Sequence, residues 1–578
     1  MVGQGLLQLG ADLALVLDVL DRFVDQLLQL DVAVVQIVAD VGEQLADFGL
    51  AIGHELDQAD QHPDPETVAE LSAIIDAAVD GDGAAIDDLA DRFDTRLTFG
   101  TAGLRGELGA GPNRMNRLLV QQAAYGFAQF LLSREEKPSV VIGYDGRVNS
   151  DIFAKDSAEI FAGLGMTVML FPHVVPTPVT ATAVRSLGYS AAVMVTASHN
   201  PPRDNGYKVY LGGEDDGSQI ISPADHEIEA SILQAADINV NDYPRSTEYA
   251  IAPESLIDEF VEKTASVSTR PATPIRFVYT AMHGVGWEVS NRCYLAAGLG
   301  DAIVVAEQIH PDGAFPTVAF PNPEEPGALD LAYATADRAG VDLIIANDPD
   351  ADRLAVAIRD NGSWRRLTGN EVGSLLGWRA AERHKGSGKP AALAASIVSS
   401  PALRAVAADY GIPYTDTLTG FKFVNRVPNL IFGFEEALGY LVDPNKVRDK
   451  DGISAAVDFL AMAGELQERG ATVVDHLDEF AERFGAFAST QISIRVNNLA
   501  EIPTITSKFR QSPPATLAGR AVTAVDDFAN GFENFPPTDL VRLTVEGGSR
   551  VIVRPSGTEP KLKIYIDAAV TDGTDRSA

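Results

Sequence analysis

The chain has 578 residues, a formal net charge of −36 and a single cysteine, Cys293. This length predicts about three to five domains, and one cysteine excludes an internal disulfide framework and fits a reducing compartment. The negative charge would repel nucleic acid and anionic lipid at long range, and neither a signal peptide nor an apolar run of ~18 residues is evident. We therefore expect a cytoplasmic protein with no nucleic-acid partner and no membrane partner.

The acidic charge is concentrated near the start of the chain. Residues 1–91 carry 20 acidic side chains against one basic one, Arg22, which is more than half of the net charge. Residues 1–55 mix leucines with Asp and Gln at roughly helical spacing. This acidic extension has three interpretations: a helix for oligomerisation or a partner, a poorly ordered leader, or an untranslated stretch before a later true start.

A first α/β domain is predicted over residues 56–250. A helical pattern starts near residue 62, and the glycine-rich run 97–106 contains Arg105, which is either an anion ligand or a surface group in a turn. Residues 140–147 indicate a buried strand ending in a polar loop, and a helix from Ser150 and a strand over 167–171 follow. This order is typical of a βαβ unit.

A serine follows the next apolar strand of this domain. The strand 191–195 leads into Thr196-Ala-Ser-His-Asn-Pro-Pro202, so the hydroxyl of Ser198 is presented at a strand end, beside His199 and ahead of Lys208. The pattern indicates a nucleophile. An ordinary strand-to-loop turn rich in Asn, Pro and Gly is the alternative.

A second α/β domain over 251–368 contains an acidic loop. Strands are expected at 275–279, 303–306 and 341–347, and the last is followed by Asp348, Asp350 and Asp352. Carboxylates about 4 Å apart repel by ~4 kcal/mol per pair at an effective dielectric near 20, so their convergence indicates a bound cation. Hard oxygen ligands suit Mg²⁺, whereas an acidic turn with splayed side chains is the alternative.

Two further domains and a short tail complete the predicted plan. A third α/β domain over 369–487 has a helix at 372–383, a strand at 391–398 and later loops at 417–422 and 434–440. The texture then changes to short strands over 488–570, typical of a smaller α+β domain, and 571–578 form a tail. Between two of those strands lies Arg554-Pro-Ser-Gly-Thr558, either an anion cradle or a hairpin turn with an incidental arginine.

Four motifs in this order resemble one enzyme family. The Thr-Ala-Ser-His-Asn-Pro run, the Asp-x-Asp-x-Asp-Arg loop, the Glu435-Glu436 pair and the Arg-Pro-Ser-Gly-Thr-Glu-Pro run look like those of the α-D-phosphohexomutases. The resemblance covers roughly residues 60–570 and lies near the branch of bacterial phosphoglucomutases and phosphopentomutases. It implies an α/β fold of four domains, three similar mixed α/β domains and a smaller α+β domain.

The resemblance also implies roles for particular residues. Ser198 would carry a phosphoryl group and join the aspartates at one Mg²⁺ per chain, Arg105 would steady the phosphoserine, and Lys208 would stabilise the transferred charge. His199 and Lys450 would be the acid and base, one for each orientation of the sugar. The substrate-binding residues would be Arg353, Thr419, Gly420, Lys422, Glu435, Glu436, Arg554, Ser556, Gly557, Thr558 and Lys561.

The implied reaction is a reversible transfer of phosphate between C1 and C6 of a hexose phosphate such as glucose or mannose phosphate. It would pass through a bisphosphate intermediate and need glucose 1,6-bisphosphate as activator. The enzyme would be a monomer or a homodimer. Ala437 stands where many relatives have Ser after the paired glutamates, which weakens the assignment of the sugar. A phosphopentomutase is the nearest alternative, and a sugar phosphatase or a non-catalytic sugar-phosphate sensor are the remoter ones.

Overall fold

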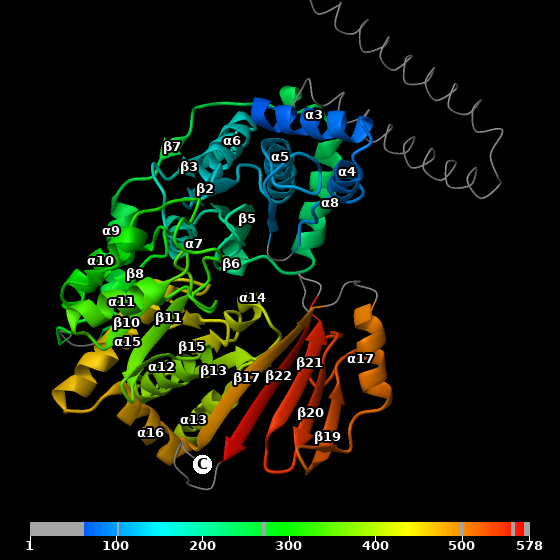
Figure 1. The fold of residues 1–578 in the computed structure, drawn as a ribbon. Coiled ribbons are helices and arrows are strands. Elements are labelled where there is room, and N and C mark those ends of the chain that lie inside the picture. The colour runs from blue at the N-terminus through cyan, green and yellow to red at the C-terminus, as the bar shows by residue number, and fades with distance from the viewer. Residues whose placement is uncertain (1–62, 101–102, 269–272, 496–500, 556–560, 571–578) are drawn as a thin grey trace, which may run out of the picture. The chain divides into compact units, whose positions relative to one another are not determined.

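A computed structural model describes residues 63–100, 103–268, 273–495, 501–555 and 561–570 (Figure 1). The acidic extension predicted over 1–55 and the tail predicted over 571–578 lie outside the described residues. The chain divides into two compact units, of which the first comprises residues 1–96 and 110–113 and the second 97–109 and 114–578. No helix among the described residues is both long and apolar enough to cross a membrane.

The described part of the first unit is a helical pair, α3 (Pro65–Val79) and α4 (Gly83–Phe93). Each helix begins after an aspartate, Asp64 or Asp82, whose side chain accepts a hydrogen bond from a backbone N–H of the first turn. Leu71 and Leu89 form the apolar contact between the helices.

The second unit begins with a seven-stranded sheet whose main path has the order β1-β5-β4-β2-β3-β7. Strands β4, β2, β3 and β7 are parallel, whereas β5 runs antiparallel to β1 and β4, and β6 pairs with β5. The strands are β1 (Leu104–Glu107), β2 (Ser139–Tyr144), β3 (Thr167–Leu170), β4 (Ala191–Val195), β5 (Asp204–Leu211), β6 (Ser218–Gln219) and β7 (Ala250–Ile251).

Helices cover both faces of this sheet, because side chains alternate along each strand. Val140 and Ile142 of β2 belong to an apolar cluster with α5 and α6, whereas Val141 belongs to a second cluster with α7. The helices are α5 (Arg117–Arg134), α6 (Ser150–Gly163), α7 (Thr177–Leu187) and α8 (Ala224–Ala236), the last packed on α5.

The second sheet has the order β12-β11-β10-β8-β9, with β9, β8 and β10 parallel. Its strands are β8 (Val278–Thr280), β9 (Ile303–Val304), β10 (Leu343–Asn347), β11 (Leu354–Asp360) and β12 (Ser363–Arg366). Its helices are α9 (Ser255–Ala265), α10 (Gly286–Ala296) and α11 (Asp330–Ala339). The turn from β10 to β11 carries the acidic loop.

The third sheet has the order β14-β13-β15-β16, and only β16 is antiparallel to its neighbour. Its strands are β13 (Ala392–Ser396), β14 (Tyr414–Thr417), β15 (Leu430–Glu435) and β16 (Gly439–Leu441). Its helices are α12 (Gly369–His384), α13 (Ala402–Tyr410), α14 (Phe421–Val424), α15 (Gly452–Glu468) and α16 (Val473–Phe484). Helix α12 starts with a capping box between Thr368 and Glu371.

Helix α15 is shared between two sheets. It contacts α12 and β16 of the third sheet and also α9, α10, β10 and β11 of the second. Fourteen of its seventeen residues are buried, as expected of a helix that is apolar on all sides. Asp451 caps the helix by accepting hydrogen bonds from the N–H groups of Ile453 and Ser454.

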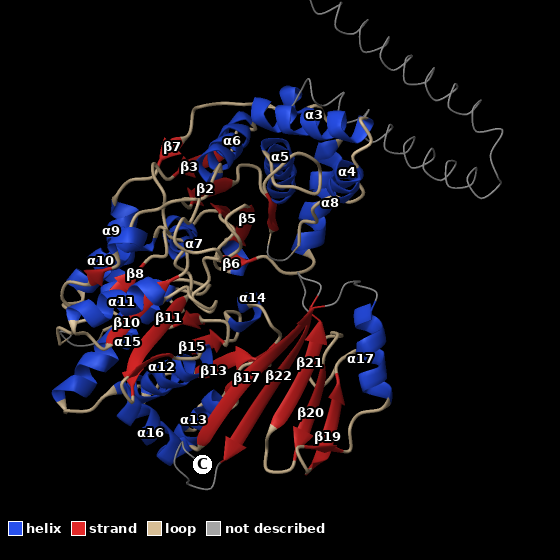
Figure 2. Cartoon of the chain, in the orientation of Figure 1, coloured by secondary structure: helices blue, strands red, loops and turns tan. Residues whose placement is uncertain are grey.

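The last sheet differs from the others because all of its paired neighbours are antiparallel (Figure 2). The order is β17-β22-β21-β20-β19-β18, and α17 (Glu501–Gln511) contacts β21. The strands are β17 (Ala486–Arg495), β18 (Thr516–Leu517), β19 (Arg520–Asp527), β20 (Val541–Val545), β21 (Arg550–Pro555) and β22 (Lys561–Val570). The predicted fold class, three similar α/β parts and a fourth of another kind, is confirmed.

Candidate active site

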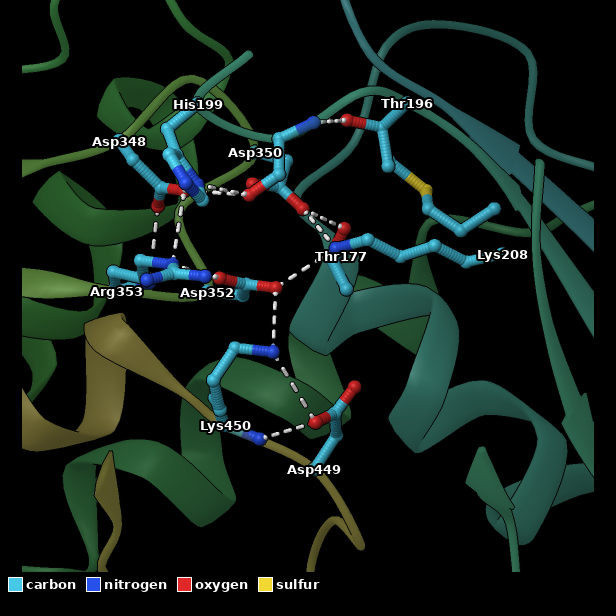
Figure 3. Close-up of polar contacts among 12 residues, drawn as sticks. Thr177, Thr196, His199, Lys208, Asp348, Asp350, Asp352, Arg353, Asp449 and Lys450 are labelled. Carbon is cyan, nitrogen blue, oxygen red and sulfur yellow. Dashed lines mark hydrogen bonds and ion pairs between the residues drawn. The ribbon is translucent and has the colours of Figure 1, made fainter. Parts of the chain in front are cut away.

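Three aspartates meet in the turn between β10 and β11. Asp348, Asp350 and Asp352 are fully buried, and one carboxylate oxygen from each lies within 4.8 Å of the others (Figure 3). Burial, and then the neighbouring Asp350 and Asp352, raise the pKa of Asp348 well above its usual value. Gathering these carboxylates without a cation is therefore unfavourable, and the cluster could hold a metal ion.

The hydrogen bonds of the cluster leave specific oxygens available. Asp350 Oδ1 and Asp352 Oδ1 are buried and have no hydrogen-bond partner in the described part of the chain. Buried polar atoms in proteins are usually hydrogen-bonded, so these two carboxylate oxygens are available as ligands for a cation, although Asp352 Oδ1 also lies 3.7 Å from Arg353 Nε. Small sets of hard oxygen donors suit Mg²⁺.

Ser198 lies directly beside this cluster. Its Oγ donates to Asp348 Oδ2 at 2.9 Å and lies 3.2 Å from His199 Nδ1. Its backbone has a φ of 53°, in the left-handed region that is unusual for serine, and its N–H donates to Thr196 Oγ1 at 2.8 Å. The loop after β4 thus brings the predicted nucleophile to the predicted metal ligands.

His199 is the uncharged group next to this hydroxyl. Burial, and then the cations Arg353 and Arg105, lower the pKa of His199 well below its usual value. Its Nδ1 lies 4.0 Å from Asp348 Oδ2. A neutral imidazole at 3.2 Å from an oxygen can accept a proton from that oxygen.

Two lysines, one on strand β5 and one in the loop before α15, contact the aspartates (Figure 3). Lys208 of β5 places Nζ 2.6 Å from Asp350 Oδ2 and 2.8 Å from Asp352 Oδ2, and Lys450 Nζ lies 3.0 Å from Asp352 Oδ2. Burial opposes the charge of Lys450, but Asp352 and Asp449 raise its pKa above the usual value. For Lys208, burial is likewise outweighed by the two aspartates. Both lysines are therefore cations in this arrangement.

Two of the predicted arginines, Arg105 and Arg353, contact the Ser198 loop and the acidic loop respectively. Arg105 of β1 donates from Nη1 to Asn200 Oδ1 at 3.1 Å. Arg353 places Nε 4.0 Å from Asp348 and 3.7 Å from Asp352, and its Nη1 donates to the carbonyl of Ala437 at 2.6 Å. Residue 437 therefore contributes its backbone oxygen to the site, a contact that its side chain does not determine.

The predicted sugar-binding pair Glu435 and Glu436 lies at the end of β15 in the third sheet. Glu435 accepts a hydrogen bond from the N–H of Gly420 at 2.7 Å. Thr419 and Lys422, which flank Gly420 in the sequence, are half-buried. Glu436 Oε2 accepts from the hydroxyls of Ser396 and Ser399, each at 3.1 Å. The structure thus brings the loop 417–422 to the paired glutamates.

Burial affects the ionisation of two of these groups. It lowers the pKa of Lys422 to about 8, even though the carboxylates of Asp225 and Glu435 oppose that change. It raises the pKa of Glu435, and the charge of Glu436 adds to the effect.

The predicted phosphate cradle is only partly described. Arg554 lies on β21 opposite Lys563 of β22, and Lys561 begins β22. Arg554 and Lys561 are both half-buried. Ser556, Gly557 and Thr558 lie outside the described residues.

Sequence reasoning missed Arg147, which holds the Ser198 loop. The side chain is buried, lies 3.6 Å from Asp145, and donates to four backbone carbonyls. The acceptors are the carbonyls of Ser198 at 2.6 Å, Asn200 at 2.7 Å, Pro201 at 2.8 Å and Asp204 at 3.0 Å. Its signal in the sequence was an arginine among small polar residues directly after a buried strand.

Two further contacts reach the site from the first sheet. Thr177, at the start of α7, donates its hydroxyl to Asp350 Oδ2. Tyr210 of β5 donates to Asp449 Oδ2 at 2.9 Å, and Asp449 Oδ1 accepts from the N–H of Lys450 at 2.8 Å. Thr and Tyr carry no distinctive spacing, so no pattern in the sequence indicated them.

Known proteins resemble this chain over most of its length. The family described as phosphoglucomutase/phosphomannomutase matches in four parts: alpha/beta/alpha domain I at residues 96–238, domain II at 254–362, domain III at 368–484 and the C-terminal domain at 494–576.

Similar individual proteins come from bacteria and yeast. A probable phosphomannomutase of Haemophilus influenzae is 53% identical over 462 residues, which is 80% of this chain and 94% of that protein. A probable phosphoribomutase of Schizosaccharomyces pombe is 38% identical, over 82% of this chain and 87% of that protein. The crystal structure of a putative phosphomannomutase from Thermus thermophilus has a TM-score of 0.63 at 22% identity, over 82% of this chain and 96% of that one, and supports the fold.

Proposed function

Because this chain belongs to the phosphoglucomutase/phosphomannomutase family, we propose that it moves phosphate reversibly between C1 and C6 of a hexose phosphate. One observation carries the proposal: Ser198 Oγ lies 2.9 Å from Asp348 in a buried cluster of three aspartates, where Asp350 Oδ1 has no hydrogen-bond partner among the described residues. A hydroxyl at a cation site is the arrangement that phosphoryl transfer requires.

The proposed reaction has two transfers. In the active enzyme Ser198 carries a phosphoryl group on Oγ. A free hydroxyl of the sugar phosphate attacks this phosphorus, the bond from phosphorus to Ser198 Oγ breaks, and the hydroxyl proton passes to a base. The bisphosphate then turns round, Ser198 Oγ gives up its proton and attacks the phosphorus of the other phosphate, the bond from that phosphorus to the sugar oxygen breaks, and an acid returns a proton to the sugar oxygen. Glucose 1,6-bisphosphate would prime the serine by the same second step.

The residues of the cluster would hold one Mg²⁺ through Asp348, Asp350, Asp352 and the phosphorylated Ser198. When bound, this ion supplies neutralisation of the charge on the transferring oxygens. Lys208, 2.6 Å from Asp350, adds positive charge on the same side, and Arg353 and Arg105 orient the phosphoserine.

Proton transfer is assigned to His199, whose neutral imidazole can accept a proton, and to Lys450, which as a cation can donate one. His199 Nδ1 is within 3.2 Å of Ser198 Oγ, and Lys450 lies on the neighbouring side of Asp352. Sugar hydroxyls would bind Glu435 and Glu436. The phosphate that does not react would be held by Lys422, Arg554, Ser556, Gly557, Thr558 and Lys561, with Thr419 and Gly420 shaping the loop.

A pentose phosphate is the second candidate substrate. The likeness to a probable phosphoribomutase over 87% of that protein favours it, and Ala437 does not contribute a hydroxyl to hold a hexose. We propose that the enzyme works in the cytoplasm as a monomer or a homodimer on either sugar.

The test is a substrate panel with Mg²⁺ and glucose 1,6-bisphosphate. We expect kcat/KM for glucose 1-phosphate or mannose 1-phosphate to exceed that for ribose 1-phosphate, with little release of inorganic phosphate. A clear preference for ribose 1-phosphate would replace the hexose by a pentose. Release of phosphate as the main product, without need of the bisphosphate, would overturn the mutase. Chelation of the metal should stop turnover, and added Mg²⁺ should restore it.

A further inference from the structure

Thr177 contacts the acidic loop from helix α7, which packs on the first sheet. It is the first residue of α7 and is fully buried. Its N–H donates to the backbone carbonyl of Asp350 at 2.9 Å, and its hydroxyl donates to Asp350 Oδ2 at 2.5 Å. The N–H groups of a first helical turn have no acceptor within the helix. Helix α7 therefore begins on two hydrogen bonds to one aspartate of the cluster.

These bonds divide the two oxygens of Asp350 between different tasks. Oδ2 accepts from the hydroxyl of Thr177 and from Lys208 Nζ at 2.6 Å. Oδ1 is buried and has no hydrogen-bond partner among the described residues. Two donors on one oxygen fix the rotation of the carboxylate, which leaves Oδ1 as the oxygen available to a cation.

Lys208 alone does not fix this rotation. Its Nζ is shared with Asp352 Oδ2 at 2.8 Å, so it balances the charge of two carboxylates at once. An ammonium on a flexible four-carbon stem acts as a point charge with no preferred direction. The hydroxyl of a β-branched threonine at a helix start has few rotamers, and it donates from one defined place.

We propose that Thr177 is a positioning residue for the metal: it holds Asp350 so that Oδ1 is presented to the divalent cation. The inference rests on the proposed function, since it requires that the three aspartates bind Mg²⁺. It adds that the affinity for the ion depends on how α7 docks onto the acidic loop, and not only on the three ligands.

The experiment compares three single variants of the full chain. Thr177→Val keeps the shape and removes the hydroxyl, and Thr177→Ser keeps the hydroxyl. Thr182→Val is the matched control, because Thr182 is a buried threonine of the same helix whose hydroxyl has no hydrogen-bond partner among the described residues. The dissociation constant for Mn²⁺, used as a paramagnetic probe for Mg²⁺, is measured by electron paramagnetic resonance of the free ion.

We expect Thr177→Val to bind Mn²⁺ ~10–100-fold more weakly, the usual effect of removing a residue that orients a metal ligand. Thr177→Ser and Thr182→Val should bind like the wild type. Unfolding midpoints of the metal-free proteins report any general loss of structure separately. If the valine variant fails to fold, Thr177→Ala, which also lacks the hydroxyl, should show the same loss of affinity.

Two results would overturn different statements. Wild-type affinity in Thr177→Val or Thr177→Ala would overturn the role of Thr177 and leave the proposed function intact. If the wild type does not bind Mn²⁺ at all, or if Asp350→Asn binds it as tightly as the wild type, the metal site itself and with it the proposed function would fail.

Discussion

The hydrogen bonds from Arg147 hold the Ser198 loop in its conformation, and their loss should be measurable. The two terminal nitrogens of Arg147 donate to four carbonyls, those of Ser198, Asn200, Pro201 and Asp204. Arg147→Lys keeps the charge near Asp145, but a lysine has three donors on one atom and reaches at most part of this set. Hydrogen bonds to a charged group contribute ~1.5–3 kcal/mol each, so two lost bonds would cost roughly 3–6 kcal/mol if the loop stayed in place.

The loop can relax to a different backbone conformation when these bonds are lost, because Ser198 is held at a φ of 53°. A non-glycine residue in such a conformation costs about 1–3 kcal/mol and persists only where its surroundings enforce it. We therefore expect Arg147→Lys to relax the loop, with a smaller loss of stability and a displaced hydroxyl. A misplacement of about 1 Å is enough for a ~100-fold loss of rate.

The assay measures kcat at saturating sugar phosphate and the free energy of unfolding in urea. Arg117→Lys is the matched control, because Arg117 of α5 forms a two-point pair with Asp156 of α6 at 2.8 and 2.9 Å, which resembles the Arg147 contacts in charge but joins two helices. It should lose stability with kcat unchanged. A kcat of Arg147→Lys equal to that of the control would refute the reasoning.

Three other outcomes are expected. Ser198→Ala should abolish turnover while substrate still binds in calorimetry, and near-normal turnover would contradict the phosphoserine. Burial lowers the pKa of Lys422 to about 8, so its positive charge is lost as pH rises through that value and kcat/KM should fall. In Lys422→Arg, kcat/KM should not change over the same pH range. An equal fall in that variant would show that Lys422 is not the cause. Gly452→Ala would place Cβ 2.2 Å from the carbonyl of Arg353 and should lower the free energy of unfolding by roughly 1–3 kcal/mol, whereas Gly83→Ala, with open space, should not.

Local patterns predicted the strands well where apolar runs were compact. The run 191–195 forms β4 with the same bounds, and the helix expected from Ser150 is α6. The strand expected at 275–279 is shorter and starts at Val278, because pairing with β9 and β10 begins only there. Short strands were expected over 488–570, but β17 and β22, the first and the last strand of this sheet in the sequence, pair with each other along ten residues.

The sequence predicted the individual loops of the candidate site but not the contacts between residues that are far apart in the chain. Ser198 and the acidic loop were found because a strand end followed by polar residues is a local signal. The ion pair between Lys208 and Asp350 joins residues 142 positions apart, and pairing across such distances is set by how sheets pack. The raised pKa of Lys450 has the same origin, since it depends on Asp352 from another sheet.

The position of α15 has a consequence for how the chain can be divided. Family models separate the second and third parts between residues 362 and 368, yet α15 belongs to the sequence of the third part and packs on both sheets. A fragment that ends at 362 would leave the faces of α9 and α10 uncovered, and one that begins at 368 would expose the other side of an almost wholly buried helix. Hydrogen exchange should therefore find the two parts opening as one cooperative block, because neither part is covered without this helix.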